Sequence, residues 1–485
     1  MMPVNMGLPF ALMGFTSAGA GELQESAGLY RRIHHIFTTV SVYKRVKSIP
    51  TSARHMGKIT GDNRVFLFLQ GPHGPFFHLL GKMLERAGAS VWRVGFNAGD
   101  RAFWFSPKSY VPYRGTLAQW DARFAEIVAE KGVTDIVLYG DTRPIHAQAV
   151  AAAKALGLGI HVFEEGYMRP YWVTYERGGS NGNSRLMKMS LNEMQAGLAH
   201  TDMDTPLPPA RWGDTRQHVF YGALYHWFVM FRNGQYRNFQ PHRALSVTKE
   251  FQLYLKRLLL MPFQALERGV ATWRIRHGGF PYHLALLQLE HDSSFQMHSP
   301  FNTMTEFLEV VMRGFAEGAP KHHHLVFKAH PLEDGRVPLR REIKRLAREL
   351  GLGGRVHYVR GGKLAALLSD VRSAVTVNST AAQQVLWRGI PLKVFGRAVY
   401  DKPEFVSTEP LATFFSAAKR PDHKAYQDYR RYLLETSQVP GGFYSSRGRR
   451  QLMRMVVDMM LTADDPYEAL EAGTAAPRQQ LRLVQ

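Results

Sequence analysis

The sequence contains no cysteine, so disulfide bridges, thiolate metal sites and a cysteine nucleophile are all excluded. It also lacks an uninterrupted run of about 20 apolar residues, the length that a membrane-spanning helix needs. The best candidate, residues 219–231, is short and contains His226. Residues 1–21 are apolar but include no lysine or arginine, and the first basic residue is Arg31, so we predict no secretory signal. These absences favour a cytoplasmic protein that does not cross a membrane.

Acidic residues are scarce relative to basic ones. The chain has 61 lysine and arginine residues against 40 aspartate and glutamate residues, which gives a formal net charge of +21. This charge favours a polyanionic partner, which can be a nucleic acid, an anionic bilayer surface or a charged small molecule. The charge alone does not choose among the three. The length of 485 residues indicates two domains or one large one.

Several motifs with a defined spacing are missing as well. The loop Gly71-Pro72-His73-Gly74-Pro75 matches neither a P-loop nor the dinucleotide fingerprint. No Gly-x-Ser-x-Gly elbow follows an apolar run, which disfavours a serine hydrolase. The consecutive histidines 322–324 would point to alternate faces of a strand and have no accompanying zinc motif. We therefore predict no metal and no cofactor.

Short apolar runs alternate with segments of helical periodicity, which predicts parallel strands joined by crossover helices in an open α/β sheet. The pattern occurs on both sides of residues 217–277, which have helical spacing, many aromatic and basic residues and few acidic ones. The predicted strands are residues 65–69, 91–96, 135–139, 160–163, 284–289, 324–328, 356–358 and 375–377. The predicted helices include residues 117–130, 146–156, 302–314, 339–350 and much of 411–461.

Ligands of open α/β sheets bind beyond the carboxyl ends of the strands, so the polar motifs that follow strands are the most informative. The first is Glu164-Glu165-Gly166, in which paired carboxylates and a glycine suit a general base with room for a substrate. The alternative interpretation is a turn at the end of a strand, with one solvated glutamate paired to Arg169.

Two motifs in the second half have residue types that bind anions. Lys328-Ala329-His330-Pro331 closes a predicted strand, and a histidine at this place can donate to a phosphate or a leaving oxygen. The alternative is a buried histidine bonded to the backbone. Asn378-Ser379-Thr380 is typical of a strand end followed by a helix cap, whose amides and hydroxyls can hold an anion. The alternative there is a plain helix cap.

A further carboxylate, Asp292, follows the predicted strand at 284–289 in a polar, serine-rich loop. A carboxylate in this position suits a nucleophile or a group that stabilises positive charge on a sugar ring. A capping aspartate is the competing interpretation.

The order of these motifs resembles that of bacterial CMP-sugar transferases with two Rossmann-like domains. More closely, residues 69–77, 163–172 and 287–301 resemble the KpsS/LipB capsule polysaccharide family, within a likeness that covers about residues 64–405. That family is similar to the retaining β-Kdo transferases, which use CMP-Kdo and begin the Kdo linker on a phosphatidylglycerol-type lipid. The resemblance therefore implies a retaining β-Kdo transferase that initiates the linker of a capsular polysaccharide and needs no cofactor.

The resemblance also implies the architecture, an α/β GT-B-like fold in which two Rossmann-like domains face each other across a cleft, with a helical basic-aromatic insertion. Residues 176–181 depart from the family pattern, because this run is longer and richer in glycine. The implied parts are an N-terminal extension (1–60), an acceptor domain (61–215), a helical linker (216–280), a CMP-sugar donor domain (281–410) and C-terminal helices with a tail (411–485).

Roles for single residues follow from the resemblance. Glu164 or Glu165 would act at the acceptor hydroxyl, and Asp292 would be the nucleophile or would stabilise an oxocarbenium ion. Positive charge from Lys328, Arg169 and His73 would neutralise the Kdo carboxylate or the phosphate. The residues implied to bind the donor are Gly71, His73, Lys328, His330, Pro331, Asn378, Ser379, Thr380 and Gln383, and those implied to bind the acceptor are Tyr167, Arg169 and Trp172.

The basic and aromatic segment is predicted to dock on the cytoplasmic face of the inner membrane. Each basic group near an anionic leaflet contributes about 1 kcal/mol, and aromatic rings settle at the interface. The alternative is a solvated helical face packed on the core. The implied partners are CMP-Kdo, an anionic phospholipid acceptor and the capsule assembly and export complex; no recognisable nucleic-acid module is present. The alternative function is a non-catalytic component of capsule polysaccharide export or assembly.

Overall fold

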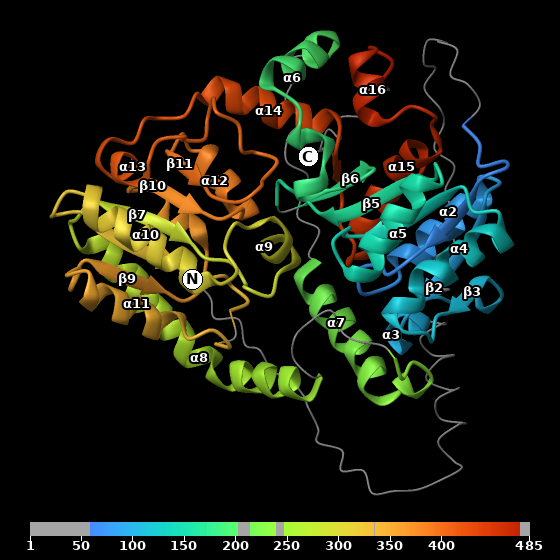
Figure 1. The fold of residues 1–485 in the computed structure, drawn as a ribbon, viewed down its shortest axis with the longest axis horizontal. Helices are drawn as coiled ribbons and strands as arrows, with labels where there is room; N and C mark the ends of the chain where they lie inside the picture. Colours follow the sequence, from blue (N-terminus) through green and yellow to red (C-terminus); the bar gives the residue numbers. More distant parts are fainter. Residues whose placement is uncertain (1–58, 170, 202–213, 239–246, 334, 476–485) are drawn as a thin grey trace, which may run out of the picture. The chain divides into compact units, whose positions relative to one another are not determined.

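The computed structural model describes residues 59–169, 171–201, 214–238, 247–333 and 335–475, so the predicted extension at residues 1–60 lies almost wholly outside the described residues. The first half is built on a seven-stranded sheet in the order β12-β6-β5-β4-β1-β2-β3 (Figure 1). Its strands are β1 (Val65–Phe68), β2 (Ser90–Gly95), β3 (Tyr110–Pro112), β4 (Asp135–Tyr139), β5 (Gly159–Glu165), β6 (Trp172–Arg177) and β12 (Gln438–Pro440).

The central strands of this sheet are apolar on both faces because helices cover both sides. Phe66, Leu67 and Phe68 of β1 are fully buried, which is the continuous apolar pattern expected for a parallel strand between two neighbours. Helix α2 (Phe76–Arg86) buries Leu80 and Leu84, one turn apart, on the face that packs on the sheet.

The second half contains a five-stranded sheet, entirely parallel, in the order β11-β10-β7-β8-β9. Its strands are β7 (Tyr282–Leu286), β8 (His324–Lys328), β9 (Val356–Val359), β10 (Val371–Thr376) and β11 (Leu392–Val394). The other helices are α3 (Ala98–Ala102), α4 (Trp120–Lys131), α5 (Pro144–Ala155), α6 (Leu191–Gly197), α7 (Asp214–Phe231), α8 (Val247–His277), α9 (Ser293–His298), α10 (Met304–Gly318), α11 (Leu339–Glu349), α12 (Gln383–Leu386), α13 (Leu411–Ala417), α14 (His423–Glu435), α15 (Ser446–Leu461) and α16 (Pro466–Glu471).

The predicted α/β class, with two Rossmann-like halves and a helical insertion, is confirmed. β4 and β8 have the bounds that the sequence predicts, and most other predicted strands are displaced by only a few residues. The predicted strand at 284–289 is shifted, because β7 ends at Leu286 and leaves Gln288 in the following loop. Strands β3, β6, β11 and β12 were not predicted.

The C-terminal stretch is not purely helical and does not stay in the second half. α13 packs on α10 of the second half, but β12 then pairs antiparallel with β6 and extends the first sheet. α15 follows and packs on α2. The predicted C-terminal helices therefore include a strand and return to the first half.

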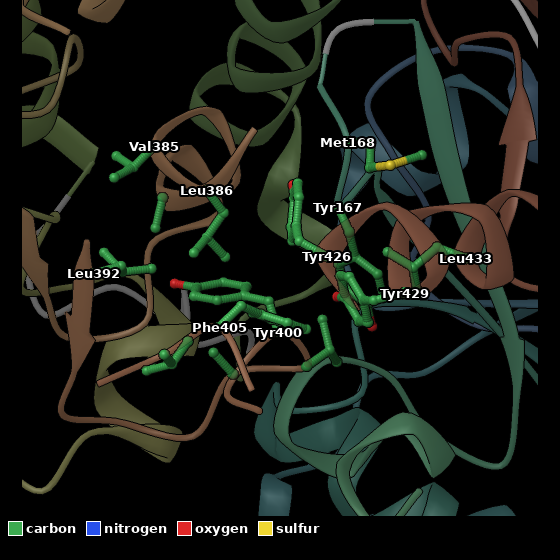
Figure 2. Close-up of a cluster of buried hydrophobic side chains, with 14 of the residues drawn as sticks. Tyr167, Met168, Val385, Leu386, Leu392, Tyr400, Phe405, Tyr426, Tyr429 and Leu433 are labelled. Carbon is green, nitrogen blue, oxygen red and sulfur yellow. The ribbon is translucent and has the colours of Figure 1, made fainter. Parts of the chain in front are cut away.

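A tyrosine-rich core joins elements of both halves. Tyr167 and Met168, from the connection between β5 and β6, belong to the same buried cluster as Leu392 and Tyr400 of the second half. Tyr426 of α14 lies in this cluster, as Figure 2 shows. This shared core fixes the β5–β6 connection relative to the second half.

The insertion consists largely of α7 and α8. α7 packs on α3 of the first half, whereas α8 contacts β9 of the second half. In the part of the chain that the structure describes, no helix combines the length and the apolar character that a bilayer crossing requires.

Candidate functional site

The parallel order β10-β7-β8 brings three of the predicted motifs to one edge of the second sheet. Asp292 follows β7, Lys328 ends β8, and Ser379 follows β10. The carboxyl ends of adjacent parallel strands lie side by side, so these residues share the edge where ligands of α/β sheets bind.

A reciprocal amide pair ties two of these strand ends together. Nε2 of Gln288 donates to Oδ1 of Asn378 at 2.7 Å, and the backbone N–H of Asn378 donates to Oε1 of Gln288 at 3.0 Å. Nδ2 of Asn378 also donates to the carbonyl of Ser294 at 2.9 Å, which holds the first turn of α9 at the same edge. Both amide side chains are buried, so Asn378 positions the site through these bonds.

Asp292 is exposed at the start of α9. Its Oδ1 accepts a hydrogen bond from the backbone N–H of Ser294 at 3.1 Å, which is the capping geometry that we considered as the alternative. The cap fixes the orientation of the carboxylate at the sheet edge, and an exposed carboxylate can reach a ligand there.

Lys328 and His330 provide the nitrogen donors of this edge. Lys328 is only 6% exposed, and burial, together with the charge of Arg268, lowers its pKa to about 8. Nδ1 of the half-buried His330 accepts from the backbone N–H of Leu332 at 3.1 Å. The proton of the neutral ring is therefore on Nε2, which is the donor form that a phosphate requires. Pro331 is exposed directly after it.

The Ser-Thr motif forms a cap. Oγ of Ser379 accepts from the backbone N–H of Ala381 at 3.3 Å, and Thr380 is half-buried beside it. Gln383 is 4% exposed, and its side-chain and backbone oxygens accept from the Tyr426 hydroxyl. Gln383 thus faces the tyrosine core, while Ser379 and Thr380 lie nearer the surface.

In the first half, the acidic motif lies within a strand instead of after one. The antiparallel partner β6 extends β5 through Glu165, with Glu164 opposite Thr174 and Glu165 opposite Val173. Gly166 is required immediately afterwards, because a Cβ there would lie 2.2 Å from the carbonyl oxygen of Trp172. The sequence prediction missed β6 and therefore placed both glutamates in a loop.

The two glutamates differ in their environments. Burial is the largest influence on Glu164 and raises its pKa to about 7; Arg169 opposes the shift, and the charges of Glu165 and Asp292 add to it. Oε1 of Glu165 instead accepts from the hydroxyls of Tyr139 and Tyr444, each at 3.3 Å. Glu164 is therefore the better general base of the pair, because its pKa lies near neutral pH.

The predicted acceptor-binding residues of the first half lie in the connection from β5 to β6 and at the start of β6. Tyr167 is buried and its hydroxyl donates to Glu176 at 2.6 Å, while Trp172 is 7% exposed at the start of β6. Arg169 is exposed, and its Nε donates to the carbonyl of Gly166 at 3.3 Å.

The glycine loop after β1 is packed against helices of the first half. A Cβ on Gly71 would lie 2.5 Å from the ring of Phe77, so only glycine fits there. The His73 ring stacks on Tyr225 of α7, with centroids 4.4 Å apart and planes at 24°.

Sequence reasoning missed the residues that fasten the first half to the second. Nζ of the buried Lys402 donates to the carbonyls of Leu186 and Met189, at 2.7 and 2.6 Å, and Arg397 donates to the carbonyl of Gly182. The one available signal was the glycine-rich departure at residues 176–181, which leads into this contact. Within the described ranges, no group of three or more histidine or acidic side chains has the arrangement of a metal site.

Comparison with known proteins places these features in a family. A profile described as "Capsule polysaccharide biosynthesis protein" matches residues 134–444. The chain is 32% identical to the Escherichia coli "Capsule polysaccharide export protein KpsS", over 79% of this chain and 97% of that protein. It is also 32% identical to the Neisseria meningitidis serogroup B "Capsule polysaccharide modification protein LipB", over 78% of this chain and 91% of that protein.

Among solved structures, the chain is similar to one described as "Thermosulfurimonas dismutans KpsC, beta Kdo 2,7 transferase". The TM-score is 0.39 and the identity 12%, over 82% of this chain and 100% of that chain. A similarity at this level carries no functional conclusion.

Proposed function

The chain belongs to the family of capsule polysaccharide biosynthesis proteins, and from this premise we propose that it is a glycosyltransferase that moves Kdo from CMP-Kdo to a phosphatidylglycerol-type lipid with retention of configuration. The product would be the first unit of the β-Kdo linker of a capsular polysaccharide.

The observation that carries this proposal is the gathering of Asp292, Lys328 and Ser379 at the carboxyl edge of the parallel second sheet, in a chain of this family. Glu164 is the next-to-last residue of β5 in the first half, and Asp292 follows β7 of the second half; the charge of Asp292 makes a small contribution to the raised pKa of Glu164, after burial. The two carboxyl groups differ in environment: Glu164 is half-buried and has a pKa of about 7, whereas Asp292 is exposed. Two carboxyl groups that differ in this way can divide the roles of general base and nucleophile at a sugar carbon.

Retention through two displacements assigns a separate task to each group. The Asp292 carboxylate would form a bond to the anomeric carbon of Kdo while the bond from that carbon to the CMP phosphate breaks, and CMP leaves with the electron pair. Glu164 would then take the proton of the acceptor hydroxyl, whose oxygen displaces Asp292 and restores the original configuration.

The leaving phosphate would be held at the edge of the second sheet. Lys328 supplies a positive charge below its pKa of about 8, and His330 supplies a ring N–H. Ser379 and Thr380 would contribute hydroxyl and amide groups. Asn378, Gln383, Tyr167 and Trp172 would act by holding these elements in position, since each is buried.

We also propose that the protein works at the cytoplasmic surface of the inner membrane. Most of the exposed large hydrophobic side chains of the described residues lie on α7 and α8. They are Val219, Phe220, Trp227, Met230 and Phe231 of α7, and Leu260, Phe263, Leu266, Val270 and Trp273 of α8. Apolar side chains of this size, in a chain of net charge +21, suit an anionic bilayer surface.

The test is CMP release in the presence of CMP-Kdo and vesicles that contain phosphatidylglycerol. Release that needs both compounds, and that His330→Ala abolishes without changing the unfolding transition, supports the transferase. Replacement of the exposed Glu349, the last residue of α11, by glutamine is the control, because it removes one charge from a residue outside the proposed site. Wild-type protein that binds capsule polymer but releases no CMP would favour the alternative, a non-catalytic export component, which the description of the Escherichia coli relative brings into consideration.

A further inference from the structure

A cavity of about 400 Å³ lies between α8 and the loop that follows β9. It adjoins the sheet edge described above, because β9 runs parallel to β8, but its lining residues take no part in the proposed chemical steps. Its polar lining comes from Arg268, Thr272, Arg276 and His277 of α8 and from Gly361, Gly362 and Lys363 of the loop.

The cavity is positively charged. Arg268, Arg276 and Lys363 line it, and none of the described lining residues is acidic. The neighbouring Glu267 does not neutralise Arg268, because it is engaged by Arg340 at 2.6 Å and by Arg360 at 3.8 Å. Three basic side chains around one hollow suit an anion such as a phosphate.

The glycine loop shapes this cavity. Gly361 and Gly362 both have a positive φ, of 60° and 82°. A Cβ on Gly362 would lie 2.5 Å from Cδ of Arg268, so a side chain there would push the arginine stem away from the loop. The Cβ position of Gly361 is 3.2 Å from Cα of Pro331, which places the loop against the turn that carries His330. The cavity is therefore a neighbour of the proposed donor site.

An apolar stripe on α8 ends at the same cavity. Phe263, Leu266, Val270 and Trp273 recur at helical spacing and are 73%, 69%, 41% and 60% exposed. Trp273 belongs to both features, since it also lines the cavity. Such a stripe is unfavourable in water but is stabilised in the acyl region of a bilayer.

We propose that this cavity binds the phosphodiester headgroup of an anionic phospholipid while the stripe on α8 enters the acyl region of the same leaflet. The proposal rests on the proposed function and deepens it, because it places the entry of the lipid acceptor beside the donor site. A nucleic acid would neutralise the three basic side chains of the cavity but would leave Phe263 and Leu266 exposed to water.

Further positive charge continues along the same surface. Beyond the Glu267–Arg340 ion pair, a second hollow of about 460 Å³ is lined by Arg341, Lys344 and Arg348 of α11, with Glu333 as its one acidic residue. An anionic leaflet that contacts α8 would meet these side chains as well, which adds to the charge complementarity.

The proposal is tested by co-sedimentation with vesicles of phosphatidylcholine, with and without phosphatidylglycerol, in the absence of CMP-Kdo. The double variant Arg268→Gln/Arg276→Gln should bind phosphatidylglycerol vesicles about 30-fold more weakly, which is about 2 kcal/mol for two basic groups near the surface. The control Arg313→Gln/Arg388→Gln removes the same charge from other exposed positions and should change binding less than about twofold. Equal loss in both double variants, or no loss in the first, would overturn the proposal.

A second measurement does not depend on the arginines. The contribution of Trp273 to the fluorescence is the difference between the wild type and Trp273→Phe. Brominated acyl chains in phosphatidylglycerol vesicles should quench this contribution, because the indole enters the bilayer. An unquenched Trp273 contribution in vesicle-bound protein would overturn the insertion of the stripe. Displacement of bound vesicles by a DNA oligonucleotide, without quenching, would assign the surface to nucleic acid instead.

These outcomes are separable from the failure of the proposed function. Vesicle binding that depends on Arg268 and Arg276, in protein that releases no CMP, would support the headgroup cavity and overturn the transferase. Lipid-dependent CMP release that is unchanged in the double variant would overturn the cavity and leave the transferase standing.

Discussion

The carboxyl group of Glu164 should make the transfer rate rise with pH near neutrality. Burial raises its pKa to about 7, and a general base acts only when it is deprotonated. With that pKa, about a tenth of the group is ionised at pH 6 and half at pH 7, so kcat/KM for the lipid acceptor, which reports the second displacement, should increase about fivefold over this interval. A glutamate with the ordinary pKa would be almost fully ionised at both values and would give a flat profile.

Substitutions of two residues near Glu164 should move the pH midpoint of this rise in opposite directions. The positive charge of Arg169 lowers the pKa of Glu164, so Arg169→Gln should shift the rise to higher pH. The negative charge of Glu165 raises that pKa, so Glu165→Gln should shift it to lower pH. The control Glu349→Gln, on α11, should leave the midpoint where it is in the wild type.

The assay is the initial rate of Kdo transfer to lipid at saturating CMP-Kdo and low acceptor concentration, at constant ionic strength. Rates are compared as pH profiles, so a variant with lower activity still reports its midpoint. A flat wild-type profile between pH 6 and pH 7, or a shift of the same sign in both variants, would refute the assignment of Glu164 as the base.

Three further predictions concern the second half. The pKa of Lys328 is lowered to about 8, so the KM for CMP-Kdo should rise about fivefold between pH 8 and pH 9, and Lys328→Arg, charged throughout, should remove this rise in steady-state kinetics. Burial lowers the pKa of His283 to about 3, so the neutral ring contributes fully to the free energy of unfolding above the unfolded pKa near 6.5, and this contribution is lost as pH falls. The free energy of unfolding should therefore decrease by about 2 kcal/mol between pH 7.5 and pH 5. Urea unfolding of His283→Gln should show a correspondingly weaker pH dependence. Lys402→Met leaves the carbonyls of Leu186 and Met189 without their donor and should cost about 2–3 kcal/mol in urea unfolding, whereas the exposed Lys419→Met should cost less than about 0.5 kcal/mol.

Strands that are buried on both faces could be read from the sequence. β4 and β8 have the predicted bounds because each is a continuous apolar run between two parallel neighbours. β6 could not be found in this way, since it carries Thr174 and Glu176 inside the protein. Its second partner, β12, comes from more than 260 residues further along the chain.

The residue types of the candidate site could be predicted from the sequence, but the hydrogen-bond partners of each side chain could not. The search for polar motifs after predicted strands led to Asp292 and His330, which follow parallel strands of one sheet, and to Glu164, which lies inside β5 of the other sheet. The sequence could not show that Gln288 donates a hydrogen bond to the side chain of Asn378, or that two tyrosine hydroxyls donate to Glu165. Those facts depend on contacts between distant segments.

The most direct test of the two-carboxylate site is single-turnover CMP release, with the enzyme in excess over CMP-Kdo and phosphatidylglycerol vesicles present. Glu164→Gln should still release CMP in the first displacement but lose about 10²- to 10⁴-fold in transfer to lipid, because only the second step needs the base. Asp292→Asn should fail in both steps. Wild-type rates in both variants would contradict the claim that the two halves act on one sugar.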